Sequence, residues 1–189
     1  MPSGVALPPA VPTVPSSAAS RLETPSSGSA KGERAPAPPG ADWQSLASRK
    51  LYSEAFTALQ AEKDRRLGPQ ELLLAADVAR LSGRPAHAVQ PLTQFLSLHA
   101  RDPRAPAAAF TLGRVLEELG DARGAAKRFE LAYTSAPRGP FAEDALARAV
   151  QSFRQSGQLA SAKRLAHDYS VAFPKGRYAA AMKALLGGQ

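Results

Sequence analysis

From residue 42 onward, apolar and polar residues recur at the three- to four-residue spacing of amphipathic helices. Residues 107–119 are an example, in which Phe110, Leu112, Val115 and Leu116 supply an apolar face. The alternating pattern of a half-buried strand is missing from this region, and the residues that favour strands are scarce. The pattern therefore predicts that this part of the chain is entirely helical.

A repeat of 37 residues runs through the helical region. Gly83, Gly120 and Gly157 keep this interval. Three further sets of residues share it: Ala88, Ala125 and Ala162; Leu72, Ala109 and Leu146; Pro137 and Pro174. An earlier, degenerate copy places Ala55 33 residues before Ala88, with Lys50 where the glycine would stand. A fixed period of this length indicates supersecondary units that stack on one another.

Each unit is predicted to be a helical hairpin. In the third unit the first helix spans residues 107–119 and the second spans residues 122–135. Gly120 ends the first helix, because glycine adopts a positive φ without Cβ strain. Pro137 ends the second helix, because proline has no N–H to donate. Two small residues are expected where the helices approach closely: Ala125 and Gly113.

The order of these residues resembles the tetratricopeptide repeat, a two-helix unit of about 34 residues. The third unit matches through Ala109, Leu112, Gly113, Ala125, Phe129, Ala132 and Pro137. The fourth keeps Leu146, Leu159, Ala162, Tyr169 and Pro174, but has Ala149 and Val150 where the family has Leu and Gly. The second has Leu72, Ala76, Ala88, Leu92 and Phe95, and the first keeps Trp43, Tyr52, Ala55 and Leu59.

The resemblance covers residues 41–189 and implies an all-α, right-handed solenoid. We expect four hairpins, with units at about 41–66, 69–102, 106–137 and 142–174, and a capping helix within 177–187. The face expected to cover the last hairpin comprises Tyr178, Ala181, Met182 and Leu185. The long links between units are similar to those of bacterial cell-envelope proteins. Examples are the assembly lipoprotein of the outer-membrane barrel machinery, the Tol–Pal-associated coordinator protein and the periplasmic part of FecR-like regulators.

In the resembled family the first helices line a concave groove that binds a peptide or protein partner. The corresponding positions here are Gln70, Leu73, Asp77 and Arg80; Phe110, Arg114 and Glu117; and Asp144, Ala147, Gln151 and Arg154. Arg80, Arg114 and Arg154 are expected along one wall, where a guanidinium can hold a carboxylate through two parallel hydrogen bonds. In the alternative, these arginines pair with acidic residues across neighbouring helices: Asp77, Glu117 and Asp144.

Residues 1–40 differ in composition from the helical region. They hold 9 of the 17 prolines, and 27 of the 40 positions are Pro, Gly, Ser or Ala. Such a segment has too little apolar surface to offset the entropy of ordering it, so a disordered linker is predicted. Its prolines interrupt any signal-peptide core, and no apolar run is long enough to span a membrane. Without a recognisable signal peptide or membrane span, the default expectation is a cytoplasmic location. The family resemblance instead suggests the periplasm or cell envelope.

The residues that carry chemistry are few. The chain has no cysteine and three scattered histidines, which argues against metal sites, disulfides and a thiol nucleophile, and no cofactor is expected. It has no phosphate loop, zinc-binding or serine-hydrolase motif, so no catalytic residue is assigned. The pairs Glu117–Glu118 and Glu143–Asp144 are interpreted as helix-surface acids. His167–Asp168 is placed in the last turn of a helix, where histidine complements the helix dipole.

The charge balance adds little about the partner. The chain has 24 Lys and Arg against 16 Asp and Glu, including the stretch at residues 62–66. These charges are dispersed, and no aromatic lies among Lys127, Arg128, Lys163 and Arg164, so nucleic acid is disfavoured. The predicted function is a non-enzymatic protein-interaction scaffold. The alternatives are the extracytoplasmic domain of a membrane-anchored, FecR-like regulator or envelope-assembly protein, and an accessory domain of an enzyme.

Overall fold

A computed structural model describes residues 42–62 and 65–187, which belong to one unit, Pro36–Gln189. Every regular element in these ranges is helical, so the all-α prediction is confirmed. The predicted linker at residues 1–40 lies outside the described residues, as do two of the five residues of the 62–66 stretch.

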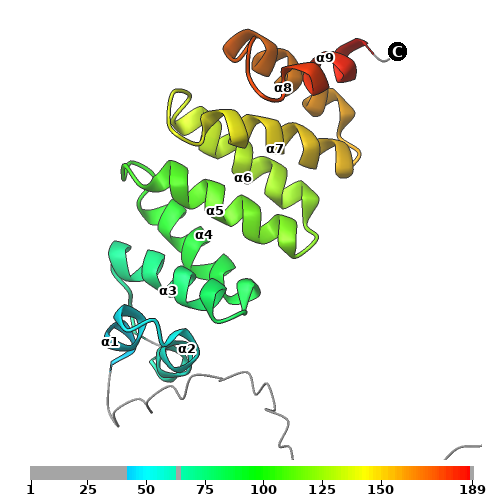
Figure 1. Cartoon of the computed structure of the whole chain (residues 1–189). Helices are drawn as coiled ribbons and strands as arrows, with labels where there is room; N and C mark the ends of the chain where they lie inside the picture. The colour runs from blue at the N-terminus through cyan, green and yellow to red at the C-terminus, as the bar shows by residue number, and fades with distance from the viewer. Residues whose placement is uncertain (1–41, 63–64, 188–189) are drawn as a thin grey trace, which may run out of the picture. The chain divides into compact units, whose positions relative to one another are not determined.

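The helices follow one another as hairpins along the chain (Figure 1). Their bounds are α1 (Trp43–Ser48), α2 (Tyr52–Ala61), α3 (Pro69–Leu81), the 3₁₀ turn η1 (Pro85–Ala88), α4 (Val89–Leu98), α5 (Ala105–Glu118), α6 (Ala122–Ser135), α7 (Ala142–Gln155), α8 (Leu159–Ala172) and α9 (Ala179–Gly187). Each α-helix contacts the next one in the chain, as a stack of hairpins requires. The predicted solenoid of four hairpins and a terminal helix is therefore confirmed.

The corners of the four hairpins have one backbone conformation. Gly83, Gly120 and Gly157 have φ of 76°, 82° and 75°, and Lys50 has φ of 60° at the corresponding corner of the first hairpin. In each case the next amide donates to the carbonyl five residues before it: 51 to 46, 84 to 79, 121 to 116 and 158 to 153, over 2.8–3.0 Å. This hydrogen bond belongs to the Schellman motif, which ends a helix and reverses the chain.

The second hairpin departs from the regular pattern. Its second half begins as η1, and α4 starts only at Val89. Pro91 explains the delay, because a helix that began at η1 would place this residue in its interior. There proline removes a hydrogen bond and clashes with the preceding turn. With the start at Val89, Pro91 lies in the first turn, where its missing N–H has no intrahelical acceptor.

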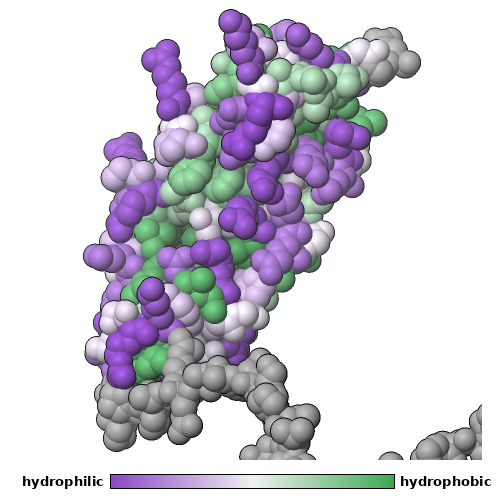
Figure 2. Space-filling view, viewed as in Figure 1, coloured by the Kyte–Doolittle hydropathy of each residue, from purple (hydrophilic) through white to green (hydrophobic). Residues whose placement is uncertain are grey.

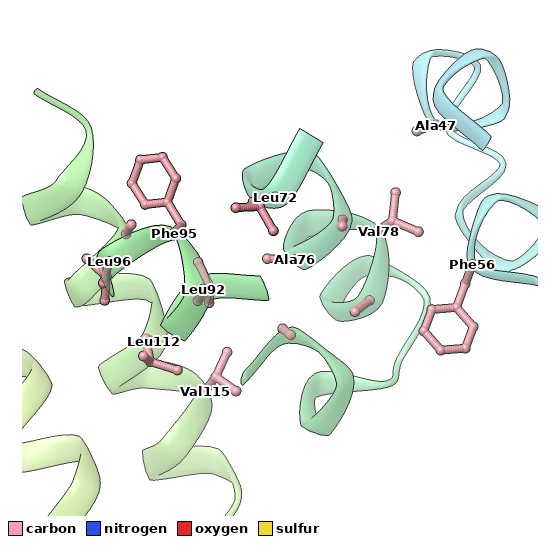
Figure 3. Close-up of a cluster of buried hydrophobic side chains, with 14 of the residues drawn as sticks. Ala47, Phe56, Leu72, Ala76, Val78, Leu92, Phe95, Leu96, Leu112 and Val115 are labelled. Atoms are coloured by element: carbon pink, nitrogen blue, oxygen red, sulfur yellow. The ribbon is translucent and has the colours of Figure 1, made fainter. Parts of the chain in front are cut away.

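The hydrophobic core is continuous from the first hairpin to the last helix. Figure 3 shows its first part, in which Phe56, Leu72, Leu92 and Leu112 come from four successive α-helices. A second cluster joins α6, α7, α8 and α9. The two clusters share three half-buried side chains: Phe110, Leu116 and Tyr133. Each hairpin therefore buries its apolar surface against its neighbours, which makes their stabilities interdependent.

Helices α5 and α6 approach closely at Gly113. A Cβ atom on Gly113 would lie 2.7 Å from two ring carbons of Phe129 in α6, whose side chain is fully buried. Ala125, one turn into α6, is also fully buried. The absence of a larger side chain at these two positions lets the hairpin close.

Helix α9 covers the apolar end of the last hairpin. Met182 is buried there, and Tyr178 and Leu185 pack against the second cluster. Ala181, predicted to share this face, is exposed, and Ala179 and Leu186 contact the cluster instead. The nine-residue helix therefore presents a slightly rotated face to α8.

Candidate binding surface

The first helices of three successive hairpins, α3, α5 and α7, carry side chains that share one surface hollow. Its lining residues are Arg80, Arg114, Val115, Glu117, Glu118 and Arg148, and its volume is about 340 Å³. We call this site the arginine hollow. Five of its six lining side chains are charged. The face viewed in Figure 2 mixes hydrophilic with apolar side chains.

A diagonal register brings the three arginines together. Helices α5, α7 and α9 begin 37 residues apart, at Ala105, Ala142 and Ala179. Side chains that touch across units are nevertheless 34 residues apart in two cases, Glu130 with Arg164 and Asp144 with Tyr178. A residue therefore contacts the residue 34 positions later in the next unit, which lies about one helical turn before its equivalent 37 positions later. Arg80, Arg114 and Arg148 keep this spacing of 34 residues and line one hollow from the first helices of three successive hairpins.

The three arginines differ in what they bind within the protein. Arg80 pairs with Asp77 one turn earlier on α3, over 3.1 Å. Arg148 on α7 reaches back to Glu117 on α5, over 2.7 Å. Arg114 is exposed and has no ion pair among the residues that the structure describes. In the described ranges, none of the pairings expected for Arg80, Arg114 and Arg154 across neighbouring helices forms. Asp77 binds Arg80 within one helix, Glu117 binds Arg148, and Asp144 binds Arg177.

The remaining predicted groove residues are distributed over other parts of the structure. Gln151 and Arg154 line a separate hollow with Gln155 and Leu159. The same two residues and Arg148 also border a depression against α9, beside Tyr178 and Met182. Arg154 therefore does not line the arginine hollow with Arg80 and Arg114, and the third arginine there is Arg148.

The predicted apolar groove residues contribute to packing. Phe110 is half-buried between the two core clusters, with its ring stacked on Phe141 at 5.1 Å and tilted against Phe129 at 5.5 Å. Leu73 is half-buried against the first cluster and Ala147 is buried, whereas Gln70 is exposed.

The acids at the start of α7 hold the link to α9, which corrects their interpretation as helix-surface acids. Glu143 accepts hydrogen bonds from the Tyr169 hydroxyl and the Arg177 amide, both over 2.7 Å. Asp144 accepts from the Tyr178 hydroxyl over 3.1 Å and pairs with Arg177 over 2.8 Å. The bond from Tyr169 lowers the pKa of Glu143, and burial, with this bond, raises the pKa of Tyr169 to about 12. These groups fix the last link in place.

The remaining sequence expectations about charged residues have mixed outcomes. His167 does not lie in the last turn of its helix, because α8 continues to Ala172. Asp168 is within 3.4 Å of Arg164 one turn earlier. Glu118 is exposed without an ion pair inside the described ranges, whereas Glu117 is engaged by Arg148. No group of three or more potential metal ligands occurs in residues 42–62 and 65–187.

Comparison with known proteins shows the fold. No protein-family model and no curated protein sequence matches this chain. Among solved structures, the TPR-like repeats of a kinesin light chain from Podospora anserina align with TM-score 0.53 and 15% identity, covering 76% of this chain and 80% of that one. The TPR protein YrrB aligns with TM-score 0.55 and 18% identity, covering 75% and 70%. MamA aligns with TM-score 0.51 and 16% identity, covering 76% and 80%.

These neighbours show that the chain has the fold of the tetratricopeptide repeat proteins. Their low sequence identity carries no residue roles over to this chain. No α-helix of the described part has the length and apolar character needed to cross a membrane.

Proposed function

We propose that this protein is a non-enzymatic interaction scaffold that binds a segment of a protein partner at the arginine hollow. The convergence of Arg80, Arg114 and Arg148 from the first helices of three successive hairpins carries the proposal. The fold supports it, because stacked helical repeats present extended binding surfaces. Among the structural neighbours, YrrB is described as a TPR protein with an unusual peptide-binding site, which supports a peptide segment as the ligand.

Recognition in this proposal needs no chemical step. The packing of α3, α5 and α7 into the solenoid fixes the hollow before the partner arrives, so little ordering entropy opposes binding. Arg114 is exposed and forms no ion pair among the described residues. Its planar guanidinium donates two parallel hydrogen bonds to a carboxylate. The neighbouring Gln151 and Arg154 extend the surface toward α9.

The substitution Arg114→Ala tests the proposal. The full chain serves as bait in a lysate of the source organism, and captured proteins are identified by mass spectrometry. Lys127→Ala is the matched control, because Lys127 is an exposed cation on α6 without an ion pair among the described residues. We expect Arg114→Ala to lose partners that wild type and Lys127→Ala retain. Identical capture by all three proteins would place the binding site elsewhere.

A second candidate is the extracytoplasmic part of a membrane-anchored regulator or envelope-assembly protein. Its support is the 37-residue spacing of the three glycine corners, longer than the family's repeat of about 34 residues. The genomic reading frame upstream of residue 1 tests this candidate. An encoded signal or apolar span would support it, and a stop codon directly upstream would contradict it.

A further inference from the structure

We infer that Glu117 is a built-in competitor of an acidic peptide ligand: its carboxylate occupies Arg148 until a carboxylate of the partner replaces it. This inference rests on the proposed function, since it concerns the same hollow. It adds the class of the ligand, a segment with two neighbouring acidic side chains, and a residue that limits its affinity.

The ligand class follows from the positions of the cations. Arg114 and Arg148 line one hollow and come from the first helices of two successive hairpins, α5 and α7. Because each guanidinium pairs best with one carboxylate, two acidic side chains of a single segment fit the two arginines. Arg80 contributes less, since Asp77 on its own helix already neutralises it.

The internal competitor follows from the pairing of Arg148. The Glu117 Oε2 atom lies 2.7 Å from Arg148 Nη1, so one acid of this chain already occupies a position where the ligand would bind. The Arg148 guanidinium carbon also lies 5.9 Å from the centre of the Phe129 ring, which supports it independently of Glu117. Phe129 therefore gives Arg148 a contact that does not depend on Glu117.

The exchange costs little because the pair is at the surface. The Arg148 side chain is 40% exposed and that of Glu117 is 27% exposed. Ion pairs at this level of exposure are weak, since water screens both partners. A ligand carboxylate forms the same bond, and the displaced Glu117 side chain remains accessible to water.

Glu118 provides a matched control. It lines the same hollow with the same charge, but it is exposed and has no ion pair among the residues the structure describes. Its removal lowers the negative charge of the hollow without releasing an arginine. Comparison of Glu117→Gln with Glu118→Gln therefore separates competition for Arg148 from general repulsion of an acidic ligand.

The experiment measures binding of a fluorescein-labelled hexaglutamate peptide to the full chain by fluorescence anisotropy. We expect Glu117→Gln to bind the peptide about three- to five-fold more tightly than wild type, the range of a weak exposed pair. Glu118→Gln should gain less than about two-fold. In an Arg148→Ala background, Glu117→Gln should lose its advantage, because the competition needs Arg148.

Two results would overturn the competitor role. Equal gains from Glu117→Gln and Glu118→Gln would mean that only net charge matters. A gain from Glu117→Gln that persists without Arg148 would mean that the pair is irrelevant. The proposed function fails separately, if Arg114→Ala leaves hexaglutamate binding unchanged. Hexaglutamate that binds none of these proteins, or binds no better than a hexaglutamine peptide, would overturn both. Circular dichroism of each variant verifies that the fold is retained.

Discussion

The close approach of α5 and α6 makes Gly113→Ala a sensitive test of the solenoid. The added methyl group would lie 2.7 Å from two ring carbons of Phe129, a distance that requires the ring or the helix to move. The ring has little freedom to move, because Phe129 is fully buried and the centre of the Phe110 ring lies 5.5 Å from the centre of the Phe129 ring. Overpacking of this kind destabilises proteins by about 1–3 kcal/mol.

The helix propensity of alanine opposes this loss. Replacing glycine by alanine within a helix stabilises it by about 1 kcal/mol. The packing term is larger at Gly113, so we expect a net loss of about 1 kcal/mol in the free energy of unfolding. For a domain of this size, the melting temperature should fall by roughly 3–5 °C.

Urea and thermal unfolding, followed by far-UV circular dichroism, measure this effect. Gly187→Ala in α9 is the control, because its added Cβ would have no atom within 4 Å beyond its chain neighbours and its own helix backbone, and it should not destabilise the protein. Phe129→Leu should partly relieve the clash, so the double variant with Gly113→Ala should lose less stability than the sum of the single variants. A Gly113→Ala variant as stable as wild type, or more stable, would contradict the close packing of α5 and α6 at Gly113.

Two further predictions concern other contacts of the stack. Ala125→Glu places a carboxylate at a fully buried position and should lower the free energy of unfolding by about 3 kcal/mol or more; an unchanged melting temperature would contradict the register of α6. The pKa of Glu143 is lowered, first by the hydrogen bond from Tyr169 and then by that from the Arg177 amide. Its contribution to stability is therefore present above the unfolded-state pKa and is lost as the pH falls through the folded-state pKa. Tyr169→Phe should raise the pKa of Glu143 measured by NMR titration, and an unchanged value would show that this bond is absent.

The repeat could be predicted from the sequence because local signals encode it. Each glycine corner needs a positive φ, and each buried position such as Ala125 needs a small side chain, so both requirements recur with the period of the units. The 3₁₀ start of the second half of the second unit was not predicted. Its signal was Pro91, which conflicts with a helix that begins at the position seen in the other hairpins.

The candidate site was harder to predict because it depends on how the units are offset. A comparison at 37 residues aligns Arg80 with Glu117 and Arg154, and it passes over Arg148. In the structure, equivalent helices of adjacent units are offset by about one helical turn, which brings residues 34 positions apart into contact. That offset depends on side-chain packing between hairpins, and the sequence pattern of a single hairpin does not specify it. The spacing of 34 between Arg80, Arg114 and Arg148 was the available signal.

The bonds from Tyr169 and Arg177 to Glu143 depend on the path of the link between α8 and α9. A helical pattern specifies the helices that flank such a link, but it does not specify the conformation of the link. The sequence therefore predicts the acids at the start of α7 only as helix-surface acids, and it does not predict that they hold the link.

The most direct test of the binding surface is an NMR titration that follows the arginine Nε–Hε signals of the full chain during addition of hexaglutamate. If the arginine hollow binds acidic segments, the signals of Arg114 and Arg148 shift together and give one dissociation constant, while the signal of Arg123 on α6 remains in place. Shifts confined to Arg123 or other arginines outside the hollow, or no shifts at all, would contradict the account.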